Sequence, residues 1–352
     1  MSDELAEILK SEPEYRRQQI YLAWFDLKIN GYDQITTLSK TLRQKLSSFP
    51  WLTVEPAVIK ESKKDKTQKA LLELSDGEAV ETVLMPRPSK KQNSPEASRW
   101  TVCLSSQVGC PIGCSFCATG AAGFRRNLSA QEIVDQARFW QRRLKVSEEA
   151  IGNVVLMGQG EPLLNYDAVK EALWILINGA KVGPSNIVLS TCGPRLGLEK
   201  IITDKDFPPV RFALSLHSAI EATRKKLVPA HWPGFFEFFI SWAKKYHAKF
   251  PSRSHFIGLE YIMLAGVNDD KKHLDALARF AEGVKRTRIN LILYNQTVGP
   301  KGTSLGNGSP DETARRWQKE LMRRGFVATL RLSQGTDIGA ACGQLKSERE
   351  KL

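Results

Sequence analysis

Three cysteines lie within eight residues in the segment Cys110-Pro-Ile-Gly-Cys114-Ser-Phe-Cys117, and Ala-Thr-Gly follows it directly. Thiolates bind soft and borderline metals, and a structural zinc site normally needs four protein ligands. No fourth cysteine or histidine stands close by in the sequence. Three thiolates can instead hold three irons of a 4Fe–4S cluster and leave the fourth iron open to a small ligand. The spacing therefore favours such a cluster over a zinc knuckle with a distant ligand or over disulfides.

A second motif, Gly158-Gln-Gly160-Glu161-Pro162, closes an apolar run. Gly-x-Gly after a strand can open a nucleotide-binding Rossmann turn, but here the third glycine is missing and a proline follows the acid. Alternatively, the glycines let the backbone approach a ligand closely while Glu161 accepts hydrogen bonds from an ammonium group. The motif alone leaves both interpretations open, and its place after the cysteine loop favours the second.

Polar side chains also end three other predicted strands. A lone histidine is more often a core residue than a ligand, but several polar residues at strand exits are what a barrel needs to bind a nucleoside. We therefore expect these side chains to face one site, whereas the neighbouring Cys192 is expected to be a small buried residue. The polar residues are Ser190, Ser215-Leu216-His217 and Asn295.

Cys342 stands in the segment Gly335-Thr-Asp-Ile-Gly-Ala-Ala-Cys342-Gly-Gln-Leu345. Its small neighbours and its position in a tail are unlike those of a core cysteine. An exposed thiol between alanine and glycine fits a mobile nucleophile. The local sequence does not decide between that role and an inert thiol.

The elements that must position these residues alternate between strand and helix. Apolar strands joined by helices indicate a parallel sheet, and the spacing suits a partial (β/α) barrel with functional residues at the C-terminal ends of its strands. The cysteine loop follows the first strand, where a barrel would place a cofactor. The predicted strands are 101–106, 153–157, 186–190, 210–216, 256–263, 290–294 and 326–332. The predicted helices start with the capping box Ser129-x-x-Glu132 and continue with 166–178, 235–247, 271–284 and 311–324.

The chain of 352 residues, 42% hydrophobic, can build one large α/β domain and a smaller one. We predict a small, mainly helical N-terminal accessory domain over residues 1–85, a linker over 86–99, the barrel over 100–332 and a tail over 333–352. The accessory domain is expected to bind RNA. Its lysines at positions 60, 63, 64, 66 and 69 are either a solvated hairpin or a phosphate-contact surface, and the net charge favours the second.

The net charge of +13 indicates a polyanionic partner such as a nucleic acid. The sequence shows no apolar signal core and no run long enough to cross a membrane, so we expect a cytoplasmic protein without membrane contact. Six cysteines in that compartment point to metal binding or catalysis.

Together these motifs resemble the radical S-adenosylmethionine (SAM) RNA adenine methyltransferases, which comprise the C2 methylases (RlmN) and the related C8 methylases (Cfr). The resemblance runs through most of the chain, including Val80-Glu-Thr-Val, and the surroundings of Cys342 are its most specific part. It implies a 4Fe–4S cluster on the three loop cysteines, Cys110, Cys114 and Cys117. It also implies that SAM contacts Gly160, Glu161, Ser190, Ser215, Leu216, His217 and Asn295.

The resemblance also implies roles that the residues' own surroundings do not suggest. Cys342 would carry a methyl group from one SAM, and reductive cleavage of a second SAM to a 5′-deoxyadenosyl radical would activate that group for addition to the non-nucleophilic C2 of adenine. Cys103 would release the protein–RNA thioether by forming a transient disulfide with Cys342. Glu81 would accept the proton of the substrate carbon. The substrates would be an adenosine of 23S rRNA and tRNA, and the electrons would come from a flavodoxin or ferredoxin.

Three departures from the family pattern bear on RNA specificity: Gln159 stands where methionine is frequent, Ala230-His231 replaces Ile-Asn, and Gln296 replaces proline. Arg125 and Arg126, just after the cysteine loop, are expected phosphate contacts on physical grounds. The alternatives are C8 methylation, as in the resistance enzymes, a non-catalytic Fe–S or zinc RNA-binding protein, and a conventional Rossmann methyltransferase.

Overall fold

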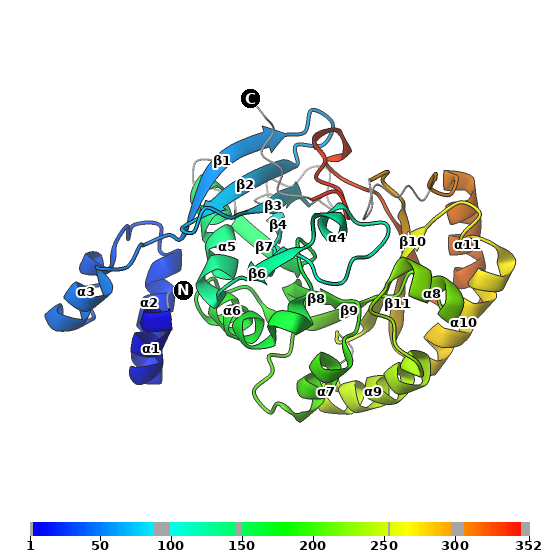
Figure 1. Ribbon diagram of the computed structural model, residues 1–352. Helices are drawn as coiled ribbons and strands as arrows, with labels where there is room; N and C mark the ends of the chain where they lie inside the picture. The colour runs from blue at the N-terminus through cyan, green and yellow to red at the C-terminus, as the bar shows by residue number, and fades with distance from the viewer. Residues whose placement is uncertain (1–2, 88–98, 145–149, 253, 298–305, 346–352) are drawn as a thin grey trace, which may run out of the picture.

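The computed structural model describes residues 3–87, 99–144, 150–252, 254–297 and 306–345. One curved sheet of ten strands dominates this part of the chain (Figure 1). Seven neighbouring strands run parallel and confirm the predicted partial (β/α) barrel. They are β4 (Arg99–Cys103), β7 (Ala150–Leu156), β8 (Ile187–Thr191), β9 (Arg211–Ser215), β10 (Ile257–Met263), β11 (Thr287–Leu293) and β12 (Val327–Arg331).

Three antiparallel strands extend the sheet beyond β4: β1 (Val54–Glu61), β2 (Gln68–Leu74) and β3 (Ala79–Pro86). The sheet therefore continues across the position where we predicted a domain boundary, because β3 pairs with β4. β1 lies at the edge of the sheet, and Pro56 stands beside a register shift in it. The predicted linker lies mostly outside the described residues. Whether residues 1–85 fold as an independent unit stays a prediction.

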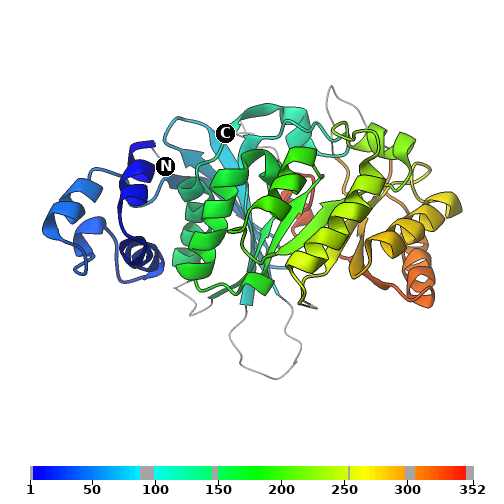
Figure 2. The same cartoon turned by 90° about the horizontal axis from the view of Figure 1, so that it is seen from below.

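Helices cover the outer, convex side of the parallel strands (Figures 1 and 2). The capping box at the start of α5 forms as predicted, because Ser129 N–H donates to Glu132 at 2.8 Å and Glu132 N–H donates to the Ser129 hydroxyl at 3.2 Å. Helices α6 and α10 begin and end at the predicted residues, whereas the short α7 and α8 were not predicted. The helices are α5 (Ala130–Leu144), α6 (Tyr166–Asn178), α7 (Arg195–Thr203), α8 (Glu221–Leu227), α9 (Phe235–Lys249), α10 (Lys271–Val284) and α11 (Asp311–Arg323). Short 3-10 helices are η3 (Pro162–Asn165) and η4 (Pro184–Asn186).

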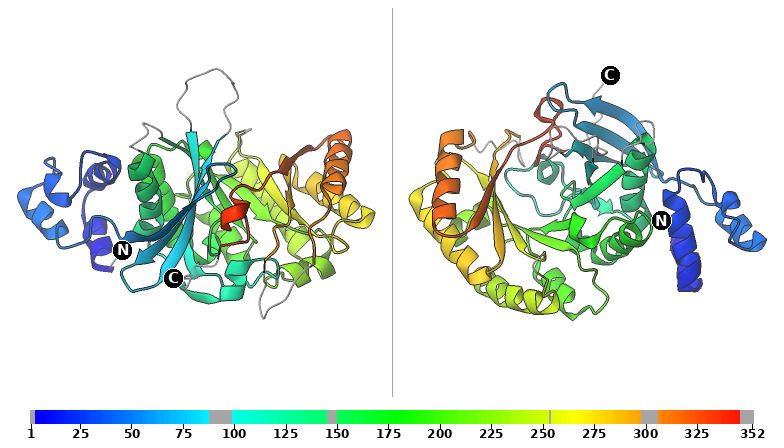
Figure 3. Two further views of the ribbon diagram at one scale, coloured as in Figure 1. Left: turned by 90° about the horizontal axis from the view of Figure 1, so that it is seen from above. Right: turned by 180° about the vertical axis from the view of Figure 1, so that it is seen from behind.

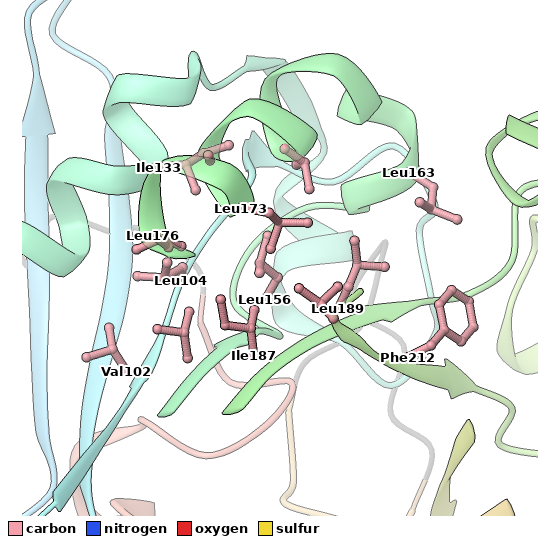
Figure 4. Close-up of a cluster of buried hydrophobic side chains, with 14 of the residues drawn as sticks. Val102, Leu104, Ile133, Leu156, Leu163, Leu173, Leu176, Ile187, Leu189 and Phe212 are labelled. Carbon is pink, nitrogen blue, oxygen red and sulfur yellow. The ribbon is translucent and has the colours of Figure 1, made fainter. Parts of the chain in front are cut away.

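The hydrophobic core lies between these helices and the sheet. Strand residues such as Val102, Leu156 and Leu189 are fully or almost fully buried and lie opposite Ile133 of α5 and Leu173 of α6 (Figure 4). Burial of this apolar surface supplies the main stabilisation of the layer. Its consequence for function is rigidity, since the strand ends that carry the polar residues cannot shift independently.

Three N-terminal helices stand beside the barrel: α1 (Asp3–Ser11), α2 (Glu14–Phe25) and α3 (Lys40–Leu46), with the 3-10 helix η1 (Tyr32–Gln34) between the last two. The fully buried Arg138 of α5 connects this N-terminal region to the barrel. Its guanidinium lies 5.1 Å from the ring of Trp24 and 4.8 Å from the ring of Trp51. It also forms an ion pair with Asp135 and donates to the Trp24 carbonyl at 3.1 Å. No helix among the described residues is long and apolar enough to cross a membrane.

Candidate active site

The cysteine loop follows β4 and the short strand β5 (Gln107–Gly109), and its last cysteine caps the helix α4 (Ala118–Ala122), which leads into β6 (Phe124–Asn127). The backbone N–H of Ser115 donates to the Leu227 carbonyl at 3.1 Å and so fastens the loop to the end of α8. A Cβ on Gly120 would lie 3.0 Å from the backbone nitrogen of Cys114, so the glycine of the Ala-Thr-Gly sequence lets α4 lie directly against the loop.

The loop forms one wall of a cavity of about 220 Å³ at the C-terminal ends of the parallel strands. Ten of the thirteen predicted site residues line this cavity, although they come from six separate segments of the chain. They are Cys103, Cys110, Cys114, Cys117, Gly160, Glu161, Ser190, Ser215, His217 and Cys342.

Three predicted residues do not line the cavity. The Asn295 amide donates to the Ser333 hydroxyl at 2.9 Å, and it is Ser333 that faces the cavity. Leu216 is fully buried, and its backbone N–H donates to the Glu260 carbonyl at 3.0 Å. Glu81 shares its face of β3 with the lining residue Val83, but Lys69 lies against its carboxylate.

The three loop thiols fit a cluster better than a single ion. Burial, together with the negative charges of Glu161 and Cys117, raises the pKa of Cys110 to about 12, and burial with the charges of the other two thiols raises the pKa of Cys114 well above its ordinary value. Such thiolates need a compensating positive charge, which bound iron supplies. All three loop thiols line the cavity, and a donor set of three thiolates suits a cluster in which each sulfur binds a different iron.

Glu161 is a buried carboxylate held in one orientation by three donors. It accepts hydrogen bonds from the Thr191 hydroxyl at 2.6 Å, the Cys192 N–H at 2.8 Å and the Leu163 N–H at 3.0 Å. Burial raises its pKa although these hydrogen bonds oppose the shift. A ligand ammonium group in the cavity would therefore find a fixed acceptor whose negative charge it would stabilise.

His217 supplies a neutral donor on the same wall. Its Nδ1 accepts a hydrogen bond from the Ile262 N–H at 3.2 Å, so the ring proton lies on Nε2. Burial, with a smaller contribution from the positive charge of Arg224, lowers the pKa of His217 to about 3 and keeps the imidazole uncharged. Beside it, the hydroxyls of Ser190 and Ser215 lie 3.3 Å apart. These uncharged hydrogen-bonding groups are better suited to bind the nucleoside part of a ligand than to bind a charged group.

The C-terminal segment, residues 335–345, returns to the inner side of the sheet and carries Cys342 to the cavity (Figure 3). Two hydrogen bonds connect one end of this segment to the turn between β1 and β2. The Gly335 N–H donates to the Asp65 carboxylate at 2.8 Å, and the Ser62 hydroxyl donates to the Asp337 carboxylate at 2.7 Å. Helix α4 holds the other end, where the Thr119 hydroxyl donates to the Leu345 carbonyl at 2.6 Å. The segment, which includes the 3-10 helix η6 (Thr336–Ile338), is therefore fastened on both sides of the exposed Cys342.

Lys69 does not serve as a surface phosphate contact, contrary to our expectation for the lysine cluster. Its ammonium lies 2.7 Å from the Glu81 carboxylate and donates to the Gly339 carbonyl at 3.2 Å. It thus connects the predicted proton acceptor with the segment that carries Cys342. Of the two arginines expected to contact phosphate, Arg126 is paired with Asp76 and Glu132, whereas Arg125 is exposed.

Arg331 is a residue that the sequence did not single out. It lines the cavity and pairs with Glu260 at 3.1 Å. The negative charge of Glu260, with smaller contributions from Cys342 and Cys103, raises the pKa of Arg331. Burial and the charge of Cys342 raise the pKa of Cys103 to about 12, against a lowering by Arg331. The sequence held one signal for this residue, a lone arginine at the exit of the last strand.

All six cysteines lie in the described part of the chain and are free thiols.

The family model of the radical SAM superfamily matches residues 104–280, which contain the cysteine loop and most of the barrel. The fold and the site thus define a radical SAM enzyme. A curated protein of Halorhodospira halophila, "Dual-specificity RNA methyltransferase RlmN", is 36% identical over 341 residues, which cover 96% of this chain and 89% of that protein. A Staphylococcus aureus (strain JH9) protein, "Probable dual-specificity RNA methyltransferase RlmN", is 36% identical over 97% of this chain and 90% of its own length. The chain therefore belongs to the RlmN family of dual-specificity RNA methyltransferases.

A solved structure supports this assignment over nearly the whole chain. The crystal structure of a radical SAM methyltransferase from Sphaerobacter thermophilus superposes with a TM-score of 0.81 and 34% identity, covering 98% of this chain and 96% of that one. Membership of the superfamily implies a 4Fe–4S cluster and SAM as cofactors, and membership of the RlmN family implies an RNA substrate.

Proposed function

We propose that this enzyme methylates C2 of an adenosine in 23S rRNA, and also in tRNA, in the cytoplasm, with two molecules of SAM per turnover and Cys342 as the methyl carrier. The observation that supports this most is that Cys103 and Cys342 line the same cavity as the three loop cysteines. A methyltransferase that needed only one direct displacement would have no use for two free thiols beside a cluster site.

When bound, the cluster and SAM would supply both the methyl group and the one-electron chemistry that activates it; Cys110, Cys114 and Cys117 would hold the cluster. Glu161 would accept hydrogen bonds from the SAM amine, while Ser190, Ser215 and His217 would orient the nucleoside part. Leu216, Gly160 and Asn295 would contribute by shaping the wall or by positioning a neighbour such as Ser333.

The chain's own thiols would then carry out the transfer. Cys342 would take the methyl group on its sulfur and become linked to the base through that carbon. The Cys103 thiolate would attack the Cys342 sulfur and break its bond to the methylene carbon, which would leave with the bonding electrons and take up a proton to become the methyl group of the base. A reductant would then have to reduce the Cys103–Cys342 disulfide before the next turnover. Glu81 would accept the proton that leaves C2. A protein of the flavodoxin or ferredoxin class would supply the electrons.

The test is nucleoside analysis by mass spectrometry of 23S rRNA and tRNA after anaerobic incubation with the reconstituted enzyme, SAM and a reductant. We expect 2-methyladenosine, and the same incubation without SAM is the control. 8-Methyladenosine would assign the enzyme to the C8 reaction instead. An enzyme that binds iron and cleaves SAM but leaves both RNAs unmethylated would contradict the proposal.

Lys69→Met should weaken both activity and stability, because it removes the cation from the Glu81 carboxylate and the donor from the Gly339 carbonyl. Breaking a buried ion pair on one side costs about 3–5 kcal/mol. We expect the free energy of unfolding to fall by about 3 kcal/mol, measured by chemical denaturation, and kcat to fall roughly tenfold to a hundredfold. Lys66→Met, in the turn just before β2, is the control. Equal effects of the two substitutions would contradict the role of Lys69.

A further inference from the structure

Arg224 of α8 is a fully buried cation without a carboxylate partner among the described residues. Its guanidinium donates to the Cys192 carbonyl at 2.6 Å and to His231 Nδ1 at 2.9 Å, and it lies 3.9 Å from the centre of the Phe235 ring. Each of these partners is uncharged. A buried charge is costly unless an opposite charge compensates it, so this arrangement requires an explanation.

The place of Arg224 in the fold points to the cysteine loop. The C-terminal end of α8 accepts the hydrogen bond from Ser115 that fastens the loop, and Leu227 and Val228 pack in one apolar cluster with the loop cysteines. Cys192, whose carbonyl Arg224 contacts, belongs to the same cluster. The guanidinium therefore lies behind the loop, on the side away from solvent.

The charges around Arg224 agree with this placement. Its positive charge disfavours protonation of His217, which lines the same cavity as the loop cysteines. His231 accepts from Arg224 through Nδ1 and is therefore a neutral ring with its proton on Nε2, which lies 3.5 Å from the Glu221 carboxylate. Glu221 is thus separated from Arg224 by an uncharged imidazole. Besides Glu221, the nearby groups that can carry a negative charge are the thiols of the loop and of Cys192, which share one apolar cluster.

We propose that Arg224 is a positioning residue that holds a permanent positive charge behind the cluster and so favours its one-electron reduction. This inference rests on the proposed function, because it requires a cluster on the loop. Reduction adds one negative charge to the site, and the electron comes from a low-potential one-electron donor, a flavoprotein or iron–sulfur protein in the cell or dithionite in the assay. No proton is transferred, because the guanidinium stays charged. In a buried site, a neighbouring fixed charge is only weakly screened.

The experiment compares four variants by potentiometric titration of the reconstituted enzyme, with electron paramagnetic resonance as the readout of the reduced cluster. Arg224→Gln removes the charge, whereas Arg224→Lys keeps it but loses the planar contacts with Phe235 and His231. His231→Glu places a carboxylate against the guanidinium, and His231→Gln is its uncharged match. We expect Arg224→Gln and His231→Glu to lower the ratio of reduced to oxidised cluster at a fixed potential about tenfold, which is ~59 mV for one electron. Arg224→Lys and His231→Gln should stay within about twofold of the wild type.

The outcomes separate this inference from the proposed function. A wild-type enzyme that takes up no iron and sulfide would contradict the proposed function. Wild-type reduction ratios in both Arg224→Gln and His231→Glu would overturn the role of Arg224. If Arg224→Gln does not assemble a cluster, His231→Glu decides, because it keeps Arg224 and its packing in place. Equal losses in His231→Glu and His231→Gln would show that hydrogen bonding, and not charge, is what matters, and would also overturn the inference.

Discussion

Cys342→Ala is expected to reduce RNA methylation by at least about a thousandfold, which is the loss typical of a removed covalent nucleophile. No other thiol can replace it, since Cys103 is buried with its pKa raised to about 12 and Cys192 is buried behind the cysteine loop. The measurement is transfer of labelled methyl groups from SAM to RNA, followed by nucleoside analysis. Iron content and thermal stability should stay at wild-type levels, because the Cys342 side chain is exposed. A variant that keeps more than about a tenth of the activity would show that Cys342 is not the methyl carrier.

Cys103→Ala is expected to stop the reaction after the base has become linked to the protein. Without the second thiol, no thiolate can attack the sulfur of the thioether between Cys342 and RNA, so we expect a stable protein–RNA adduct and a loss of multiple turnover of about a hundredfold or more. Denaturing gel electrophoresis with labelled RNA would show the adduct, and Cys342→Ala on the Cys103→Ala background should abolish it. Turnover without an adduct in Cys103→Ala would contradict the resolving role.

The raised pKa of Cys103 also gives this step a pH dependence in the wild type. The attacking form is the thiolate, whose fraction rises about tenfold per pH unit below the pKa. Release of RNA from the adduct should therefore accelerate as the pH rises through the neutral and alkaline range. Part of the pKa elevation comes from the charge of Cys342, which disappears once that sulfur is alkylated, while Arg331 continues to favour the Cys103 thiolate. Release of RNA from the adduct at neutral pH should thus be faster than the pKa of Cys103 in the free enzyme implies.

The sequence predicted the barrel strands well because each is an apolar run between turn residues, a signal that is strongest in β10, where every residue is buried. It predicted α6 and α10 because both are long amphipathic segments. It missed α7, where Gly197 interrupts the pattern, and the seven-residue α8, whose last turn holds three basic residues. A short helix has too few turns for a period to be recognisable, so its stability comes from tertiary contacts.

The residues of the site also differ in how well the sequence predicted them. Residues in compact motifs, such as the cysteine loop and Glu161, could be predicted to meet, and the structure brings them to one cavity. The partners of Lys69, Arg224 and Arg331 could not be predicted, because these side chains contact residues that lie far away in the chain. Lys69 and Gly339, for example, are separated by 270 residues. In the sequence alone, such a lysine is indistinguishable from its exposed neighbours.

The fastening of residues 335–345 by the β1–β2 turn also sets the order in which the molecule can be assembled. Asp65 and Gly335 are 270 residues apart, and contacts of such separation form only after the intervening chain has become compact. We therefore expect the Cys342 sulfur to reach the cavity late in folding. If Cys342 is the methyl carrier, a partly folded chain that exposes this thiol would not yet present it to the barrel.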